Sequence, residues 1–294
     1  MDDHQSLHRI VYFKFSVNVF RIVAQAFALL KELRAAKIDL VVNFETFNNA
    51  SAVFSYLTKA PVRVGLNNRH EKRFYTHYIN RDYQAHITEV FSDLLRVLDI
   101  KFCYAYHSFP VKEHARQTVQ QIVKDQSYIC FHPGTSVNFS GRRSREEYFV
   151  NLANLCIQKF GLPVYFTGAD KEQLIIARIM EKVCDKSKAV DVSGRFTIAE
   201  LIEFLRGCKL FVANDTGPVH LAASLKVNTV VMFGPNLPQR YRPLNQNSLV
   251  FYKGSACSPC MGAEFLTQAC RNQYQCLDFD PQETFAQISK KFFE

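Results

Sequence analysis

The hydrophobic pattern in the last two thirds of the chain alternates between short apolar runs and longer amphipathic segments. Consecutive apolar positions are typical of strands that are buried on both faces. The segments between the runs carry apolar residues at helical spacing. The predicted strands lie at 129–131, 163–166, 189–192, 210–213 and 229–233, and the predicted helices at 146–160, 171–183, 198–206 and 218–225. This alternation predicts a parallel, doubly wound α/β sheet, with its binding crevice beyond the carboxyl ends of the strands.

The first 115 residues show a thinner version of the same pattern. The predicted elements are a helix over 20–36, a strand over 40–44, a helix over 50–57, a strand over 62–64 that Gly65 closes, and a helix over 87–98. Residues 107–115 are predicted to link two domains. We therefore expect an N-terminal domain over residues 1–115 and a C-terminal domain over residues 116–294.

Composition and charge narrow the classes of function. The chain has 294 residues, of which 48% are hydrophobic and 21% charged, as in a globular protein. The net charge of +9 favours anionic partners or a basic solvated surface. The basic residues are dispersed and are not interleaved with aromatic residues along one face, which disfavours nucleic-acid binding. We expect no transmembrane helix and no signal peptide, and hence a cytoplasmic protein, with peripheral contact at the inner membrane face left open.

The most informative motif is a buried strand that runs into an Asn-Asp-Thr-Gly turn and then into a helix. Asp215 or Thr216 can act as the N-cap, and Pro218 fits the first helical turn. Gly217 lets a ligand approach the backbone closely, and His220 can donate to the same ligand. Free N–H groups and the helix dipole favour an anion such as a diphosphate. The alternative is a capped helix that binds no ligand.

Two further loops follow predicted strands of the same sheet. A His-Pro-Gly-Thr-Ser loop places the hydroxyl groups of Thr135 and Ser136 at a strand end. Arg142 and Arg143 come shortly afterwards and can bind phosphate oxygens in pairs, although a solvated basic surface is the alternative. Glu172 follows the next strand, where its carboxylate can accept hydrogen bonds from a ribose. The alternative is an exposed Glu at a helix start.

Together these stretches resemble a known family. The motifs HPGTS, RR, TG-x3-E, SGRFTIAEL and NDTGPVHLAASLKVNTVVMFGP are similar to those of the ADP-heptose:lipopolysaccharide heptosyltransferases, glycosyltransferase family 9, over about residues 38–290. The resemblance implies a GT-B fold, which has two Rossmann-like doubly wound domains and an active site between them. It also implies inverting transfer of a heptose-like sugar from an ADP-heptose-like nucleotide sugar to a lipid-anchored saccharide of the lipopolysaccharide type. No metal ion or other cofactor is implied for catalysis.

The resemblance assigns roles to individual residues. Thr135 and Ser136 would contact the phosphates, Arg142 or Arg143 would replace the family's basic phosphate ligand, and Glu172 would hold the ribose. The residues that would surround the diphosphate and the sugar are Asp215, Thr216, Gly217 and His220.

The N-terminal part departs from the family pattern. The expected Gly-Asp loop, which carries the general base, is not found, and the strand-like segment 10–15 is followed by Ser-Val-Asn. We therefore expect an incomplete N-terminal domain that lacks about two βα units and exposes an apolar sheet edge. Glu45 follows the predicted strand 40–44 and is the candidate substitute base. The usual Trp-Pro after the basic pair is replaced by Ser144 and Arg145. A non-catalytic nucleotide-sugar-binding or regulatory protein is the alternative function.

Four cysteines are clustered near the C-terminus: Cys257, Cys260, Cys270 and Cys276. The spacing C-x2-C-x9-C-x5-C is compatible with a structural zinc ion held by four thiolates. Two disulfides and four free thiols are the alternatives.

Overall fold

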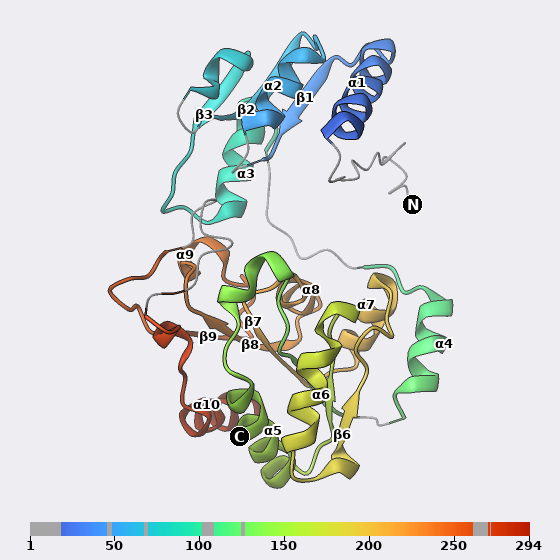
Figure 1. The fold of residues 1–294 in the computed structure, drawn as a ribbon, viewed down its shortest axis with the longest axis vertical. Coiled ribbons are helices and arrows are strands. Elements are labelled where there is room, and N and C mark those ends of the chain that lie inside the picture. The colour runs from blue at the N-terminus through green and yellow to red at the C-terminus, as the bar shows by residue number, and fades with distance from the viewer. Residues whose placement is uncertain are drawn as a thin grey trace. The chain divides into compact units, whose positions relative to one another are not determined.

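The chain forms two compact units, which consist of Met1–Cys103 and Tyr104–Glu294 (Figure 1). The computed structural model describes residues 19–45, 49–67, 70–101, 109–124, 127–260, 270 and 272–294. The division comes earlier in the chain than the boundary expected after residue 115. Residues 113–115, which we expected in the linker, instead begin helix α4 (Glu113–Ile122), and α4 packs against α7 (Ile198–Arg206) of the second unit.

The second unit is built on a six-stranded, fully parallel sheet with strand order β6-β5-β4-β7-β8-β9. Its strands are β4 (Ile129–His132), β5 (Val164–Phe166), β6 (Ala189–Asp191), β7 (Leu210–Asn214), β8 (Asn228–Phe233) and β9 (Ser248–Tyr252). From β4 the chain adds strands outward on one side as far as β6, and it then returns to add β7, β8 and β9 on the other side. Strand order therefore reverses between β4 and β7, and open α/β sheets bind their ligands at such a switch point.

Helices cover both faces of this sheet, because its strands are apolar on both faces. Ile129 and Phe131 of β4 face the cluster formed with α5 (Glu146–Phe160), α6 (Gln173–Lys182) and α10 (Pro281–Ile288). Cys130, which lies between them, points to the cluster formed with α4, α7 and α8 (Gly217–Ser224). The same alternation recurs along β5, β7 and β8, and this confirms the expectation of a parallel sheet covered on both sides.

The predicted elements of the second unit form close to their expected positions, and local sequence sets their ends. Helix α7 begins with a capping box, in which Thr197 Oγ1 accepts from the Glu200 N–H and Glu200 Oε2 accepts from the Thr197 N–H. Helix α5 ends at Gly161, whose φ of 68° is the left-handed conformation that glycine adopts readily. Strand β9 and helices α4, α9 (Pro238–Tyr241) and α10 were not predicted.

The first unit contains a three-stranded parallel sheet with strand order β1-β2-β3. Its elements are α1 (Val19–Ala35), β1 (Leu40–Asn43), α2 (Asn49–Leu57), β2 (Val62–Asn67), β3 (His77–Asn80) and α3 (Ile87–Arg96). We expected Gly65 to close β2, but this glycine lies inside the strand. A Cβ atom at Gly65 would lie 2.1 Å from Cζ of Tyr75, so the absent side chain makes room for this ring. The Tyr75 hydroxyl in turn contacts Nδ2 of Asn43 at 2.7 Å.

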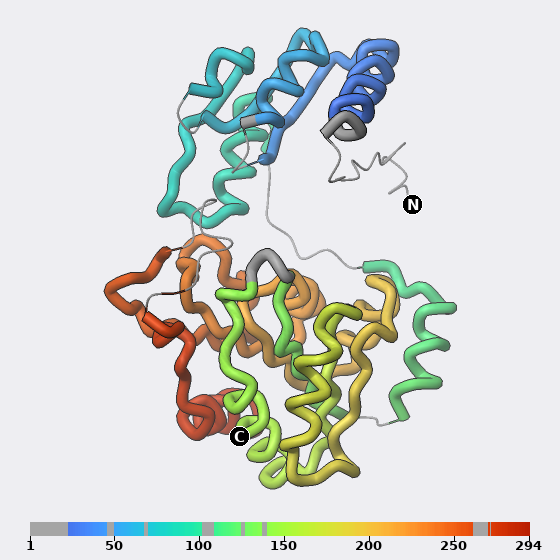
Figure 2. Tube along the Cα trace, viewed as in Figure 1, coloured from blue at the N-terminus to red at the C-terminus, as the bar shows by residue number. Residues whose placement is uncertain are grey.

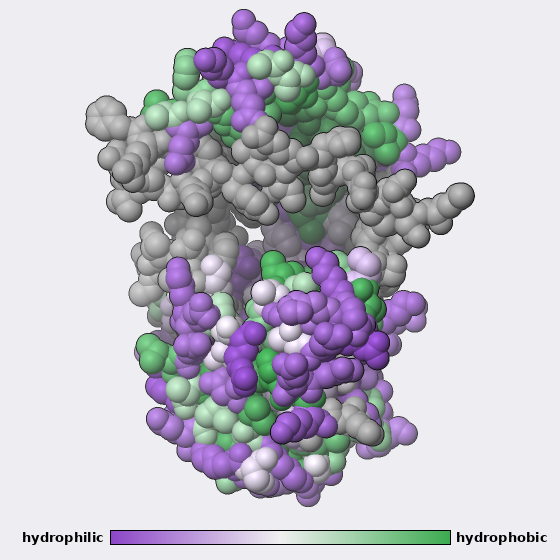
Figure 3. Space-filling model, turned by 90° about the vertical axis from the view of Figure 1, so that its right-hand side faces the viewer, coloured by the Kyte–Doolittle hydropathy of each residue, from purple (hydrophilic) through white to green (hydrophobic). Residues whose placement is uncertain are grey.

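Much of the apolar surface of the first unit is exposed. Its buried cluster is centred on four residues of β2 and α3, whereas Val23 and Phe27 of α1 are 61% and 68% exposed. Figure 3 shows hydrophobic residues, in green, gathered on the surface of the first unit in the upper part of the view. Among the described residues β1 pairs with β2 alone, and its first residue, Leu40, is 42% exposed. The segment 10–15, which we expected to be a strand, lies outside the described residues. Within the described part of the chain, no helix is long and apolar enough to cross a membrane.

Candidate functional site

The predicted ligand residues of the second unit gather at the carboxyl ends of β4 and β7, on either side of the switch point. The neighbouring segments 133–136 and 142–145 meet residues 214–217 there, which lie about 70 to 80 positions further along the chain (Figure 2). Parallel strands end at the same edge of a sheet, so the loops that follow them share one crevice. These residues were expected to meet beyond the carboxyl ends of the parallel strands, and the structure places them there.

Asn214, the last residue of β7, joins the other two segments. Its side chain is fully buried, its Nδ2 donates to the Pro133 carbonyl at 2.8 Å, and its Oδ1 accepts from the Ser144 N–H at 3.0 Å. Both backbone groups belong to loops and gain from Asn214 a partner that a sheet or helix would otherwise supply. One side chain therefore fixes both loops to the end of β7.

Helix α8 begins in this crevice with an open N-terminus. Thr216 occupies the N-cap position with extended backbone angles, but its side chain makes no capping hydrogen bond. Thr216, one of the two residues expected at the N-cap, therefore occupies that position without a capping bond from its side chain. Among the described residues, a Cβ atom added to Gly217 would meet no atom within 4 Å beyond its chain neighbours and its own helix. The start of α8 thus offers backbone N–H groups and open space, as an anion site requires.

Asp215 is buried beside this helix start. Its Oδ2 lies 3.4 Å from Nη1 of Arg142 and accepts a hydrogen bond from Nδ2 of Asn236. Burial raises the pKa of Asp215, and the nearby positive charge of Arg142, the hydrogen bond from Asn236 and the charge of His220 act in the opposite direction. Because these contacts engage the carboxylate, Asp215 orients Arg142 and does not cap α8.

Thr135 and Arg143 connect the first two loops at their tips. Nη2 of Arg143 lies 3.3 Å from the Thr135 carbonyl oxygen and 3.5 Å from its hydroxyl, which are long hydrogen bonds. Burial lowers the pKa of Arg143, against the effect of nearby carboxylates. Thr135 is buried, whereas Ser136 is exposed and its side chain makes no capping hydrogen bond at the following 3₁₀ turn. The structure therefore brings Arg143 to Thr135 beside the carboxyl ends of β4 and β7, where Arg142 contacts Asp215.

Glu172 is buried and is not the exposed helix-start residue that one interpretation of the sequence allowed. Its Oε2 accepts from the Ala169 N–H at 2.7 Å and lies 3.8 Å from Nε2 of His132. A Cβ atom at Gly134 would lie 2.2 Å from the Glu172 carboxyl group, so glycine permits this close approach. Burial lowers the pKa of His132, while Glu172 acts to raise it. In this structure the Glu172 carboxylate joins the loops after β4 and β5, and its contact with a ribose stays a prediction.

Glu45, the candidate base, lies in the first unit. It follows β1, is exposed, and donates its backbone N–H to Oδ1 of Asn43 at 3.0 Å. Its placement at the carboxyl end of β1 agrees with the predicted strand.

The cysteine cluster lies next to the loop that carries Asn236. The Cys260 N–H donates to the Pro235 carbonyl at 3.1 Å, and a Cβ atom at Gly234 would lie 3.0 Å from Sγ of Cys276. Burial raises the pKa of Cys276 to about 11, and the charges of the other three thiols add to the rise. The thiols thus lie within electrostatic range of one another. Among the described residues, however, no group of three or more His, Cys, Asp or Glu side chains has an arrangement that could hold a metal ion.

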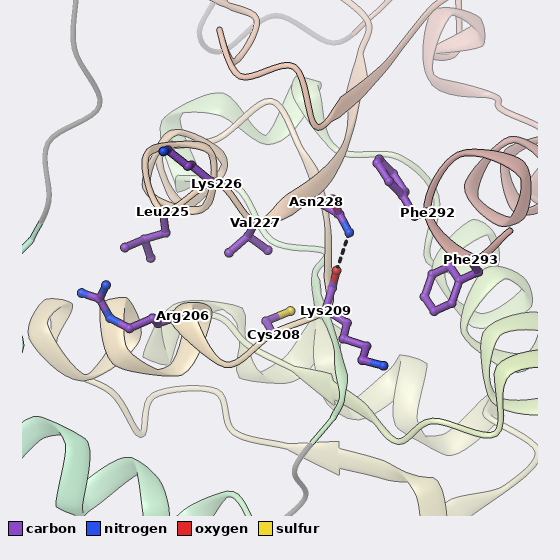
Figure 4. A pocket seen from close by; sticks show the side chains of 9 residues that line it. All are labelled: Arg206, Cys208, Lys209, Leu225, Lys226, Val227, Asn228, Phe292 and Phe293. Atoms are coloured by element: carbon purple, nitrogen blue, oxygen red, sulfur yellow. Dashed lines mark hydrogen bonds between the residues drawn. The ribbon is translucent and has the colours of Figure 1, made fainter.

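A cavity of about 410 Å³ lies at the opposite, amino-terminal end of β7 and β8 (Figure 4). Arg206, Lys209 and Lys226 line one part of it, and Phe292 and Phe293 line another. Arg206 ends α7, and Lys226 follows the C-cap of α8. Cations are favourable at helix C-termini because of the helix dipole, so these charges have a structural explanation. The two ends of the sheet therefore differ in the helix ends that they offer to a ligand.

The sequence profile of glycosyltransferase family 9 (heptosyltransferase) matches residues 26–270, which is well over half of the chain. The chain belongs to glycosyltransferase family 9. A lipooligosaccharide heptosyltransferase 2 of Campylobacter jejuni is 25% identical over 275 residues, which cover 90% of this chain and 79% of that relative.

Solved structures of this family share the fold. A family 9 glycosyltransferase of Veillonella parvula superposes with a TM-score of 0.75 at 19% identity. The match covers 95% of this chain and 80% of the Veillonella chain. The Escherichia coli ADP-heptose lps heptosyltransferase II has a TM-score of 0.71 at 19% identity and covers 92% and 81%, respectively. At this level of identity the likeness shows the α/β fold with its parallel sheets.

Two residues near the site of this family 9 chain were missed by the sequence analysis, namely Asn214 and Asn236. Neither residue is an obvious phosphate ligand, and each acts on a neighbour within the protein. A signal for Asn214 was present, because an amide at the end of a strand that is apolar on both faces must find partners when it is buried.

Proposed function

We propose that this protein is an inverting glycosyltransferase that transfers a heptose-like sugar from an ADP-heptose-like donor to a saccharide acceptor of the lipopolysaccharide type. Membership of family 9 and the heptosyltransferase names of its relatives support this activity. One observation of the structure carries the proposal. The open start of α8, with Gly217 beside empty space, lies at the switch point together with Arg142, Arg143 and Thr135.

The charge of the site suits a nucleoside diphosphate. The backbone N–H groups at the start of α8 and two guanidinium groups supply donors and positive charge, and Arg forms paired contacts with phosphate oxygens. Asp215 offsets part of that charge through its contact with Arg142.

The reaction follows from this arrangement. An acceptor hydroxyl attacks the anomeric carbon of the sugar, the glycosidic bond to the diphosphate breaks, and the nucleoside diphosphate leaves with the bonding electron pair. Negative charge grows on the leaving phosphate oxygen in the transition state. Donors that are already positioned around that oxygen stabilise the developing charge without having to reorganise. We assign this role to the start of α8 together with Arg142 and Arg143.

Calorimetric titration with ADP, followed by a transfer assay with ADP-heptose and a heptose-free lipopolysaccharide acceptor, tests the proposal. We expect ADP to bind and the sugar to be transferred with inversion at the anomeric carbon. Binding without transfer would favour the alternative, a nucleotide-sugar-binding protein without catalysis. Absence of ADP binding would refute the proposed donor site.

The transfer also requires a general base that accepts the proton of the acceptor hydroxyl. We propose Glu45 as the base in place of the family's Asp, because it is a carboxylate at the carboxyl end of a parallel strand. If it is the base, Glu45→Gln lowers kcat by about 10²–10⁴-fold and leaves the affinity for ADP unchanged. An unchanged kcat would assign the base to another residue. A lipid-anchored acceptor and peripheral membrane contact also stay predictions.

The cysteine cluster stays open between a structural zinc ion, disulfides and free thiols. The described residues do not fit a metal ion as they stand, so no step of the reaction is assigned to a metal. Elemental analysis of the purified protein, together with counting of free thiols, distinguishes the three states.

A further inference from the structure

We propose that Asn214 is a positioning residue, which holds the Thr135 loop (residues 133–136) and the arginine loop (residues 142–145) in the geometry that binds the donor diphosphate. This inference rests on the proposed function, because it concerns how the donor site is assembled. Asn214 itself contacts protein groups and carries no assigned contact with the donor.

The contacts of Asn214 make it the junction of the site. Its amide hydrogen bonds, of 2.8 Å to Pro133 and 3.0 Å to Ser144, connect β7 to residues that are 81 and 70 positions away in the sequence. The side chain is 0% exposed, so water does not compete for either bond. Breaking one of them leaves a buried group without a partner, which is costly.

Each bond lies next to a residue that we assign to the diphosphate. Pro133 is two residues before Thr135, and Ser144 directly follows Arg143. The direct link between the loop tips, from Arg143 to Thr135, is longer, at 3.3 and 3.5 Å. The end of β7 also fixes Arg142, because the next residue, Asp215, lies 3.4 Å from its guanidinium group. The relative positions of all three ligand residues therefore depend on one strand end.

The side-chain amide of Asn214 serves both loops. Its Nδ2 donates to one backbone group while its Oδ1 accepts from the other, whereas a carboxylate can only accept and an aliphatic side chain can do neither. A site whose donors are held in place before binding loses less entropy when the ligand arrives. Asn214 thus increases affinity for the diphosphate without touching it.

The test compares Asn214→Ala with Asn228→Ala as a matched control. Asn228 also donates from its side chain to a loop carbonyl, that of Lys209 at 3.1 Å, but at the opposite end of the same strands (Figure 4). Binding of ADP and of AMP is measured by calorimetry, well below the melting temperature of each variant. We expect Asn214→Ala to weaken ADP binding on the order of tenfold to a hundredfold and AMP binding less. The ratio of the two affinities should therefore fall.

A structural role alone would not change that ratio, because loss of folded protein reduces the binding of both nucleotides equally. Asn228→Ala should keep the wild-type ratio even if it lowers the melting temperature. An unchanged ratio in Asn214→Ala would overturn the inference, and so would an equal fall in the control.

Asn214→Leu keeps the size of the side chain, removes both hydrogen bonds and keeps the inference testable if the Ala variant does not fold. An aliphatic side chain can neither donate to the Pro133 carbonyl nor accept from the Ser144 N–H. Hydrogen–deuterium exchange without nucleotide should therefore rise in residues 133–136 and in residues 142–145. No rise in either loop would overturn the inference alone. Failure of the unaltered protein to bind ADP would instead refute the proposed function, while the exchange pattern would still report whether Asn214 holds the loops.

Discussion

The two units have the same kind of sheet but bury it to very different degrees. In the second unit, helices cover both faces of six parallel strands, and residues such as Phe131 and Phe211 are fully buried on opposite faces. In the first unit, three strands share one small cluster, and Phe27 is 68% exposed. A parallel sheet is stable when both of its faces are covered. The second unit meets this condition with its own helices, and it also carries the proposed donor site.

The largest expected effect comes from truncating a large side chain in each unit. Phe211→Ala removes a fully buried ring and should lower the free energy of unfolding by about 3–5 kcal/mol. Phe27→Ala removes an exposed ring and should change it by no more than about 0.5 kcal/mol. Urea unfolding followed by circular dichroism measures both values. A comparable loss in Phe27→Ala would mean that the face of α1 is buried in solution, which would break the comparison.

The second prediction asks whether the chemistry belongs to the well-packed unit. Arg142→Ala removes the cation that we propose to face the leaving phosphate and should slow transfer about a hundredfold, equivalent to about 3 kcal/mol in the barrier. Arg145→Ala is the matched control, because Arg145 lies in the same loop. Its side chain is 59% exposed, and its Nη1 makes a long contact of 3.9 Å with Oδ1 of Asp278. Steady-state kinetics of sugar transfer measure kcat for both variants. Equal losses in the two variants would show that Arg142 acts through general charge and not through its position.

The third prediction concerns the first unit. Gly65→Ala forces a methyl group into the ring of Tyr75 and should destabilise this unit by about 1–3 kcal/mol. Hydrogen–deuterium exchange should then rise in β1, β2 and α3 and stay unchanged in the second unit. If protection against exchange fell equally in both units, the two units would unfold together. The difference between them would then be one of packing and not of stability.

The smallest expected effect depends on pH. Burial raises the pKa of Asp215 above its ordinary value of 3.8, so the charged form is unfavourable in the folded protein. Stability associated with this group is therefore present at low pH and is lost as the pH rises through the raised pKa, by about 1.4 kcal/mol for each unit of the rise. Asp215→Asn should melt at a higher temperature than the wild type at neutral pH, and the difference should vanish as the pH falls toward 3.8. A difference that does not change with pH would rule out this explanation.

Sequence alone predicted the strands and helices that bury many apolar residues. Helices α5 and α7 form with their predicted bounds, because periodicity and end signals agree there. The missed elements bury little. Helix α4 has a largely polar sequence, with Ala115 and Val119 as its buried residues, and β9 is an edge strand of partly buried residues. The start of α10 was legible, since Asp280 accepts from the Gln282 N–H and Pro281 occupies the first turn.

The candidate site was predicted as a set of ligand types and not as a network. Thr135, Arg142 and Asp215 lie where the strand ends predicted them, because parallel strands bring successive loops to one edge. Which of them face a ligand and which bind another side chain depends on contacts between distant segments. The buried positions of Glu172 and Asp215, and the junction at Asn214, arise from such contacts. The sequence indicates that a buried Asn214 needs partners, but it does not identify the distant groups that supply them.

Gly217 has one more consequence. Since a methyl group placed there would touch no other segment in the described part of the chain, the packing of these residues does not require a residue so small. Substituting side chains of increasing size at this position would therefore measure the unfilled volume beside the start of α8. The size at which catalysis ceases would report how closely the bound sugar nucleotide approaches the chain.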